Sequence, residues 1–240
     1  MAEGHTRENS GFLAESERRV LIAIARRLPE AVNSDHLTAL GLGAMAATGA
    51  CFVAAGAHPA WLLGVVVALA LNWFGDSLDG TVARVRGRQR PRFGYYVDHV
   101  IDILGAALLL AGLALSPFMH PLVAASLLAA YAMVCAETYL ATHAVGIFRM
   151  AFLRVGPTEL RIILAIGALA LLRDPHVAIG GAQYRLFDVG GVIATAGLGI
   201  ALCTAVVRNT RTLYRAEPLP SRPGHAVSAG TGARDVVVSR

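Results

Sequence analysis

Hydrophobic residues are gathered into six long runs separated by short polar segments. The runs cover residues 37–57, 60–75, 103–115, 122–136, 162–172 and 189–207. A helix needs about 20 apolar residues to cross the hydrocarbon of a bilayer, and only the first and last runs approach that length. The four central runs become long enough when the polar residues beside them are included, so each of these helices has one polar end. We therefore expect an all-α, polytopic membrane protein with six transmembrane helices.

The segment before the first run has a different pattern. Residues 12–31 interleave apolar side chains such as Val20 and Ile24 with charged ones such as Glu17 and Arg18, as an amphipathic helix does. We expect this helix to lie in the membrane interface. An ordinary amphipathic helix that faces solvent is the alternative.

Both ends of the chain are polar. The start of the chain, of which residues 1–11 are the first part, is polar and mixed in charge over too long a stretch to be a cleavable signal peptide. Residues 216–240 are rich in Pro, Gly, Ser and charged residues, which predicts a disordered tail. We therefore expect a single six-helix domain over residues 12–215.

Composition excludes several classes of protein. Of the 240 residues, 55% are hydrophobic and 15% are charged, and the mean hydropathy is +0.57, which excludes a water-soluble globule. All 21 basic residues are Arg, which excludes chemistry that needs a lysine ammonium, such as a Schiff base or a Walker A site. Cys51, Cys135 and Cys203 lie far apart within apolar runs, so we expect neither a disulfide framework nor a cysteine zinc site.

The distribution of arginine predicts the orientation in the membrane. With the N-terminus in the cytosol, nineteen of the 21 basic residues fall on the cytosolic side, and only Arg173 and Arg185 fall on the other. Because Arg-rich loops stay cytosolic, we expect an integral protein of the inner or plasma membrane with both termini in the cytosol. The net charge of +5 suits anionic lipid. Nucleic acid is not an expected partner, because the arginines are scattered over four segments without an aromatic platform.

In this topology seven charged residues of the helices fall at the cytosolic side. They are Asp76, Asp79, Asp98, Asp102, Glu137, Glu159 and Arg161. A charge in a spanning helix is costly and normally faces the bundle interior or a water-filled cavity. We therefore expect the functional site in a polar cavity that opens to the cytosol. Intramembrane carboxylates also build ion or proton transporters, which is the alternative function from another class.

Four of these charges are aspartates arranged in two pairs. Asp76 and Asp79 are three residues apart, and Asp98 and Asp102 are four apart, so each pair shares one helix face. The two helices are sequential and antiparallel, so the pairs can face each other. Four carboxylates in a partly dehydrated site repel one another and need cations. Two divalent ions would balance them, and oxygen ligands suit Mg²⁺ or Mn²⁺.

Small residues and an arginine follow the first pair. Gly80 and Ala83 remove side-chain bulk on the face that carries Asp76 and Asp79, and Arg84 offers a guanidinium fork suited to a phosphate. Metals, a phosphate-binding arginine and a spare carboxylate that removes a proton from a hydroxyl indicate a site for phosphoryl transfer.

At these residues the chain resembles the CDP-alcohol phosphotransferase (CDP-alcohol phosphatidyltransferase) family of integral membrane enzymes. The signature reads Asp76-x-x-Asp79-Gly80-x-x-Ala83-Arg84, then nine residues, then Gly94-x-x-x-Asp98-x-x-x-Asp102. Every position of the motif is filled. The six-helix pattern and the N-terminal interfacial helix also match, so the resemblance covers roughly residues 12–207.

The resemblance implies a role for each position of the motif. The metal ligands would be Asp76, Asp79, Asp98 and Asp102, of which Asp102 would also be the general base. The cytidine diphosphate part of the donor would be held by Asp79, Gly80, Ala83, Arg84 and Gly94. An acceptor hydroxyl would attack the phosphorus next to the alcohol moiety, with CMP as the leaving group. The lipid would enter from the bilayer and the water-soluble partner from the cytosol, and a homodimer is expected.

The residues that would bind the acceptor are less specified. Arg149, Arg154 and Arg161, together with Glu137, are candidates for holding an anionic acceptor such as a sugar phosphate or glycerol phosphate. Alternatively, Arg161 forms an ion pair with Glu137 or Glu159 that lets two helices pack, and Arg149 and Arg154 are interface anchors. The first choice of donor is CDP-diacylglycerol with a polar acceptor. A CDP-choline or CDP-ethanolamine donor with a diacylglycerol acceptor is the alternative.

Overall fold

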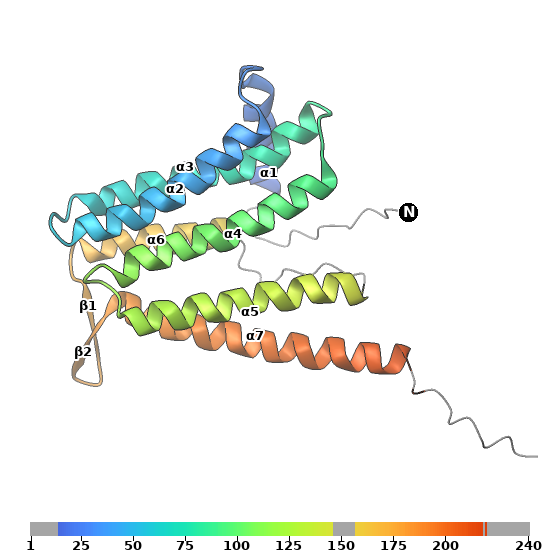
Figure 1. The fold of residues 1–240 in the computed structure, drawn as a ribbon. Helices are drawn as coiled ribbons and strands as arrows, with labels where there is room; N and C mark the ends of the chain where they lie inside the picture. Colours follow the sequence, from blue (N-terminus) through green and yellow to red (C-terminus); the bar gives the residue numbers. More distant parts are fainter. Residues whose placement is uncertain (1–13, 146–156, 218, 220–240) are drawn as a thin grey trace, which may run out of the picture.

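The computed structural model describes residues 14–145, 157–217 and 219. In this part of the chain seven helices and a two-stranded hairpin follow one another (Figure 1). They are α1 (Ala14–Arg27), α2 (Ser34–Ala55), α3 (Trp61–Val85), α4 (Pro91–Ala114), α5 (Pro121–Val145), α6 (Pro157–Leu171), β1 (His176–Ile179), β2 (Ala182–Arg185) and α7 (Leu186–Ala216). The expected polar N-terminus and nearly all of the expected C-terminal tail lie outside the described residues.

Five of these helices, α2, α3, α4, α5 and α7, are long and apolar enough to cross a membrane, and they contain five of the six hydrophobic runs. The run 162–172 also forms a helix, but α6 has only 15 residues and is shorter than a spanning helix needs to be. It ends there because Arg173, Asp174 and Pro175 follow the apolar run. The expected sixth span is therefore not confirmed.

A short hairpin interrupts the expected all-α fold between α6 and α7. Its strands pair antiparallel, with Ile179 opposite Ala182, so Gly180 and Gly181 form a two-residue loop. Both glycines have positive φ, 59° and 84°, which the tight hairpin turn requires and which other residues rarely adopt. The observed fold is therefore nearly all-α, whereas the sequence predicted a fold with no strands. The Gly-Gly pair was a readable signal for this turn.

Helix α2 holds α3 and α4 beside it. It packs extensively against both, whereas α3 and α4 have almost no direct backbone contact with each other. The close approaches use glycine: a Cβ added to Gly75 of α3 would lie 2.7 Å from the backbone nitrogen of Gly41, and one added to Gly112 of α4 would lie 2.3 Å from the Cα of Gly49. Small residues let helix backbones approach in this way, and the contacts fix the spacing of α3 and α4.

The main apolar core lies at the end of the bundle remote from α1. Phe52 of α2 is fully buried there, and its ring meets the edges of Phe118 and Phe187 at centroid distances of 6.5 and 5.5 Å. Helix α5 packs along α7, and α6 packs against α3. The carboxylates Asp76, Asp98 and Asp102 are not part of this core.

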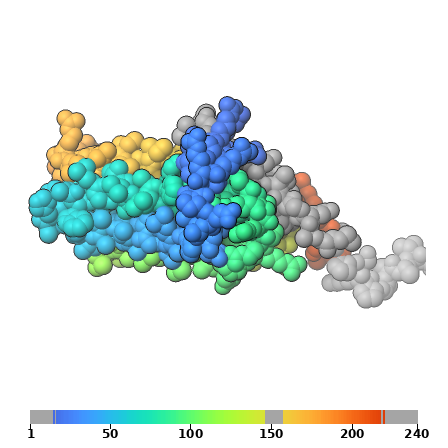
Figure 2. Space-filling view, turned by 90° about the horizontal axis from the view of Figure 1, so that it is seen from above, coloured from blue at the N-terminus to red at the C-terminus, as the bar shows by residue number. Residues whose placement is uncertain are grey.

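Helix α1 crosses the end of the bundle at a steep angle instead of running along it (Figure 1), and Figure 2 shows it on the molecular surface. It lies within the expected amphipathic segment 12–31 and ends before Pro29, whose ring cannot continue a helix. Its buried residues Leu21 and Ala25 are one turn apart and pack against Leu37, Leu78 and Val82. The amphipathic pattern is thus used to dock α1 onto α2 and α3.

Candidate metal and substrate site

Three of the expected metal ligands lie together. Oxygen atoms of Asp76 on α3 and of Asp98 and Asp102 on α4 are all within 4.8 Å of one another, and the three side chains are half-buried. The helices reach this arrangement because Gly87 turns the short loop with φ 63° and Pro91 begins α4. Carboxylate oxygens at this spacing fit one hard divalent cation, such as Mg²⁺ or Mn²⁺.

The fourth expected ligand, Asp79, has other partners. Its Oδ2 accepts a hydrogen bond from the hydroxyl of Thr38 on α2, at 2.7 Å, and its Oδ1 accepts one from the backbone N–H of Gly80. Asp79 is not part of the group of three carboxylates. Thr38 carries no signal in the sequence, because its role depends on how α2 crosses α3.

Arg161 on α6 reaches the carboxylate group. Its Nε donates to Oδ1 of Asn72 at 2.6 Å, and its Nη2 donates to Oδ2 of Asp76. The amide of Asn72 in turn donates to the backbone oxygen of Gly41 on α2 at 2.9 Å, so this asparagine joins α2, α3 and α6. The side chains of Arg161 and Asp76 are only 15% and 25% exposed, so solvent screens their ion pair weakly.

Glu137 takes no part in this arrangement. Its Oε1 accepts a hydrogen bond of 2.7 Å from the amide of Asn209 on α7. The ion pair considered between Glu137 and Arg161 is therefore not the one observed, and Arg161 pairs with Asp76 instead. Arg149 and Arg154, the other two candidates for the acceptor, lie outside the described residues.

Gly80, the first small residue of the signature, lies beside the guanidinium of Arg84. The Nη2 of Arg84 donates to the hydroxyl of Thr81 at 3.0 Å, and its Nη1 would lie 3.3 Å from a Cβ added to Gly80. A larger residue at position 80 would therefore push the guanidinium away. Gly94, in the first turn of α4, has open space where a Cβ would be.

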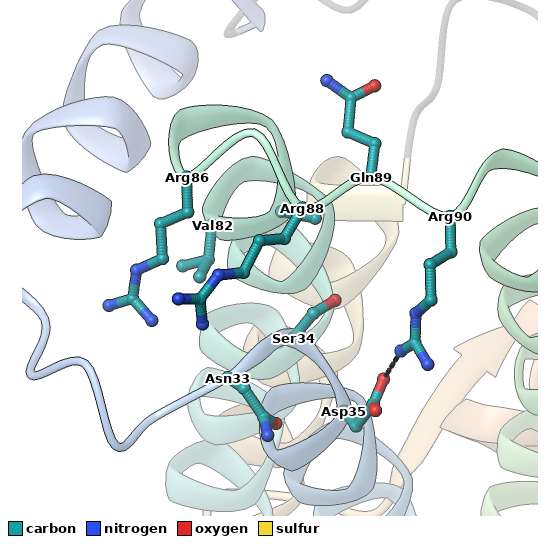
Figure 3. Close-up of a pocket in the computed structure, with 9 residues that line it drawn as sticks. Asn33, Ser34, Asp35, Val82, Arg86, Arg88, Gln89 and Arg90 are labelled. Atoms are coloured by element: carbon teal, nitrogen blue, oxygen red, sulfur yellow. Dashed lines mark hydrogen bonds and ion pairs between the residues drawn. The ribbon is translucent and has the colours of Figure 1, made fainter.

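Ala83 lines a pocket of about 400 Å³ between the start of α2 and the loop that joins α3 to α4. Figure 3 shows the arginines of this loop around the pocket. Arg86 is held by the backbone oxygens of Leu28, Pro29 and Val32, and Arg90 pairs with Asp35. The wall of the pocket is thus basic. It is formed by the start of α2, the end of α3 and the loop that follows α3.

An aromatic group lies on α4 beside the carboxylates. His99 is buried, its Nδ1 lies 2.6 Å from the backbone oxygen of Tyr95, and its ring contacts Tyr95 and, across the helix interface, Tyr139 of α5. The sequence pattern singled out neither tyrosine. Tyr95 lies one turn before His99 on α4, whereas Tyr139 reaches His99 only because α5 packs on α4.

The apolar helices and the carboxylate group are those of a membrane protein whose acidic site lies at one end of a helical bundle. Comparison with known families agrees, because the family model of CDP-alcohol phosphatidyltransferase matches residues 34–207. The chain belongs to this family. No curated protein matches the chain. The matched range begins with α2, so α1 lies before it.

Family membership and the apolar helices together define the class of the protein. It is an integral membrane phosphotransferase of lipid biosynthesis, which takes a CDP-alcohol as donor and an alcohol as acceptor. The family uses a divalent metal. The group of Asp76, Asp98 and Asp102 fits such an ion by the chemistry and spacing of its oxygens.

Proposed function

We propose that the protein transfers a phosphatidyl group from CDP-diacylglycerol to the hydroxyl of a polar acceptor, with release of CMP. The observation that carries this proposal is the meeting of Asp76, Asp98 and Asp102, together with a basic pocket that Ala83 lines two turns beyond Asp76 on α3. Carboxylates that hold cations and arginines that hold phosphates are the groups that transfer from a diphosphate requires.

Two divalent cations, Mg²⁺ or Mn²⁺, would supply charge neutralisation of the diphosphate and polarise its phosphorus. Asp76, Asp98 and Asp102 would hold the two cations. Asp79 would become a further ligand once its carboxylate gives up the hydrogen bond from Thr38 and binds a cation instead. Asp102 accepts the proton of the acceptor hydroxyl. The hydroxyl oxygen forms a bond to the phosphorus next to the diacylglycerol, and the bond from that phosphorus to the CMP oxygen breaks, so CMP leaves with the electron pair.

The remaining residues of the signature orient the donor. Arg84 is already turned over Gly80 by its bond to Thr81, where its fork can meet a phosphate. The small side chains of Gly80, Ala83 and Gly94 leave space for the nucleotide. Arg161, in contact with Asp76, is the described candidate for an anionic acceptor.

The orientation expected from the arginines places this site at the cytosolic side, with both termini in the cytosol and α1 in the interface. The steep crossing of α1 over the bundle end supports the interfacial placement (Figure 1). A reporter fused to the C-terminus tests the side of the membrane. The expected homodimer is tested by the mass of the detergent-solubilised protein in light scattering.

The function is tested by CMP release from the purified protein with Mg²⁺ or Mn²⁺. One arm offers CDP-diacylglycerol with a pool of polar acceptors, and the other offers CDP-choline or CDP-ethanolamine with diacylglycerol. We expect release in the first arm, and none after chelation of the metal. Release of CMP only in the second arm would show that the donor is CDP-choline or CDP-ethanolamine and not CDP-diacylglycerol. Silence in both arms, from folded protein that binds Mn²⁺, would contradict both choices of substrate.

A further inference from the structure

Glu17 on α1 makes contacts that its position on an amphipathic helix does not predict. Its Oε1 accepts a hydrogen bond of 2.6 Å from the indole nitrogen of Trp73 on α3 and one of 2.8 Å from the hydroxyl of Thr158 on α6. The hydroxyl of Ser77 lies 3.5 Å from the same oxygen. One carboxylate thus joins three helices, and we call these four residues the Glu17 cluster.

The Glu17 cluster lies beside the contacts of Arg161. On α6, Thr158 and Arg161 are three residues apart, and on α3 Trp73 and Asp76 are three apart, so each pair lies on one side of its helix. The same two helices are therefore joined twice, one turn apart. Glu17 bridges them at the first joint, and Arg161 bridges them through Asp76 at the second.

The charge of Glu17 suits this place. Thr158 is in the first turn of α6, where the partial positive charge of the helix dipole stabilises a carboxylate. Hydrogen bonds to an ionised acceptor are also stronger than neutral ones. Thr158 is three residues before Arg161, so its bond to Glu17 holds the part of α6 that leads directly into Arg161.

We propose that Glu17 is a positioning residue for Arg161: it fixes the first turn of α6 on α3 and so holds the guanidinium of Arg161 on Asp76. The proposal rests on the metal site of the proposed function. It concerns α1, which precedes the part of the chain that the family model matches. The helix expected in the membrane interface would thereby set the charge next to a metal ligand.

The position of Arg161 has a consequence for metal binding. Its positive charge beside Asp76 repels a divalent cation, so a firmly held Arg161 weakens metal binding. Arg161→Gln removes the charge, while the amide of glutamine, at the position of the arginine Nε, can still donate to Asn72. The charge effect then dominates, and we expect Mn²⁺ to bind about tenfold more tightly in this variant.

The experiment measures Mn²⁺ binding to the full chain in nonionic detergent, from the loss of the electron paramagnetic resonance signal of free Mn²⁺. Glu17→Ala is compared with the parent, with Arg161→Gln and with the double variant. Thr158→Val removes the bond from Thr158 to Glu17 and keeps the bond from Trp73. This variant takes the place of Glu17→Ala if Glu17→Ala fails to fold. Glu15→Ala is the matched control, because Glu15 lies two residues away on α1 and pairs with Arg19 at the surface.

We expect Glu17→Ala and Thr158→Val to tighten Mn²⁺ binding about threefold, in the direction of Arg161→Gln, and Glu15→Ala to leave it unchanged. Because Glu17 acts through Arg161, adding Glu17→Ala to Arg161→Gln should change the affinity by less than about twofold. Additive effects, or parental affinity in both Glu17→Ala and Thr158→Val, would overturn the proposal. So would a parent that binds no Mn²⁺.

Release of CMP, measured on the same samples, separates this inference from the proposed function. Coupled Mn²⁺ affinities without CMP release keep the positioning role and reject the proposed donors. CMP release with uncoupled affinities keeps the function and rejects the role of Glu17.

Discussion

The guanidinium of Arg161 donates to Asp76, the same carboxylate that lies within 4.8 Å of ligand oxygens of Asp98 and Asp102. Three carboxylates and one guanidinium leave two negative charges, which one divalent cation balances. A second cation brings two more positive charges, of which Asp79 would balance only one, and the carboxylate of Asp79 is bonded to Thr38 in the structure. The arginine therefore influences how strongly, and how many, cations are held.

Replacing Arg161 by Lys separates its charge from its geometry. A lysine ammonium keeps the charge, but a single nitrogen does not reproduce the two donors that reach Asn72 and Asp76. We expect kcat to fall about 10- to 100-fold, with little change in the Mg²⁺ concentration that gives half-maximal CMP release. Arg19→Lys is the control, since Arg19 pairs with Glu15 on the exposed surface of α1. Parental kcat in Arg161→Lys would contradict a role for the fork.

Asp102→Asn tests the general base. The amide cannot take the proton of the acceptor hydroxyl, so we expect CMP release to fall about 10²- to 10⁴-fold. Because Asp102 is also a candidate ligand, Mn²⁺ binding is measured in parallel to separate the two roles. The control is Asp188→Asn, because Asp188, in the first turn of α7, accepts a hydrogen bond from the backbone N–H of His120, away from the carboxylate group. Turnover near that of the parent would remove Asp102 from the base role.

The meeting of Asp76 with Asp98 and Asp102 could be predicted from the sequence because its geometry is local, whereas the bond between Asp79 and Thr38 could not. Spacings of three and four residues fix which side chains share a helix face, and two sequential helices must meet at the loop that joins them. The pairing of Arg161 with Asp76 spans 85 residues and depends on α6 packing against α3. No periodicity in either helix carries that information.

The sequence pattern predicted a helix in this segment, and its placement in the membrane interface stays a prediction; the pattern did not predict what the polar face of α1 contacts. The pattern places Glu17 among the solvated charges, yet its carboxylate meets an indole and a hydroxyl from two other helices. Asn72 was missed for a related reason, since a single amide within an apolar run gives no periodic signal. The hairpin was missed although the Gly-Gly pair marks its turn, because its strands have four residues each, too few to show alternation.

Gly75→Ala tests the crossing of α2 and α3. A Cβ there would lie 2.6 Å from the backbone oxygen of Leu37 and 2.7 Å from the nitrogen of Gly41, so the helices must separate. Overpacking of this kind costs about 1–3 kcal/mol, and we expect the melting temperature to fall by about 2–12 °C. The measurement is thermal unfolding in detergent, with Gly43→Ala as control because nothing lies within 4 Å of its Cβ. An equal melting temperature in the two variants would show that α2 and α3 are not rigidly packed here.

Ala83→Leu distinguishes the transferase from an ion transporter. Ala83 lines the basic pocket, and a larger side chain there takes space from the nucleotide of the donor. We therefore expect the KM for CDP-diacylglycerol to rise at least about tenfold, equivalent to about 1.4 kcal/mol of binding, while Mn²⁺ affinity stays within about twofold because no metal ligand changes. In a transporter Ala83 would have no role, so ion flux in vesicles would be unaffected by Ala83→Leu.

Ala70→Leu is the matched control: it makes the same change at an exposed position of α3, outside the pocket, and should leave KM unchanged. A raised KM in both variants would point to distortion of α3, and an unchanged KM in Ala83→Leu would remove the pocket from the donor site.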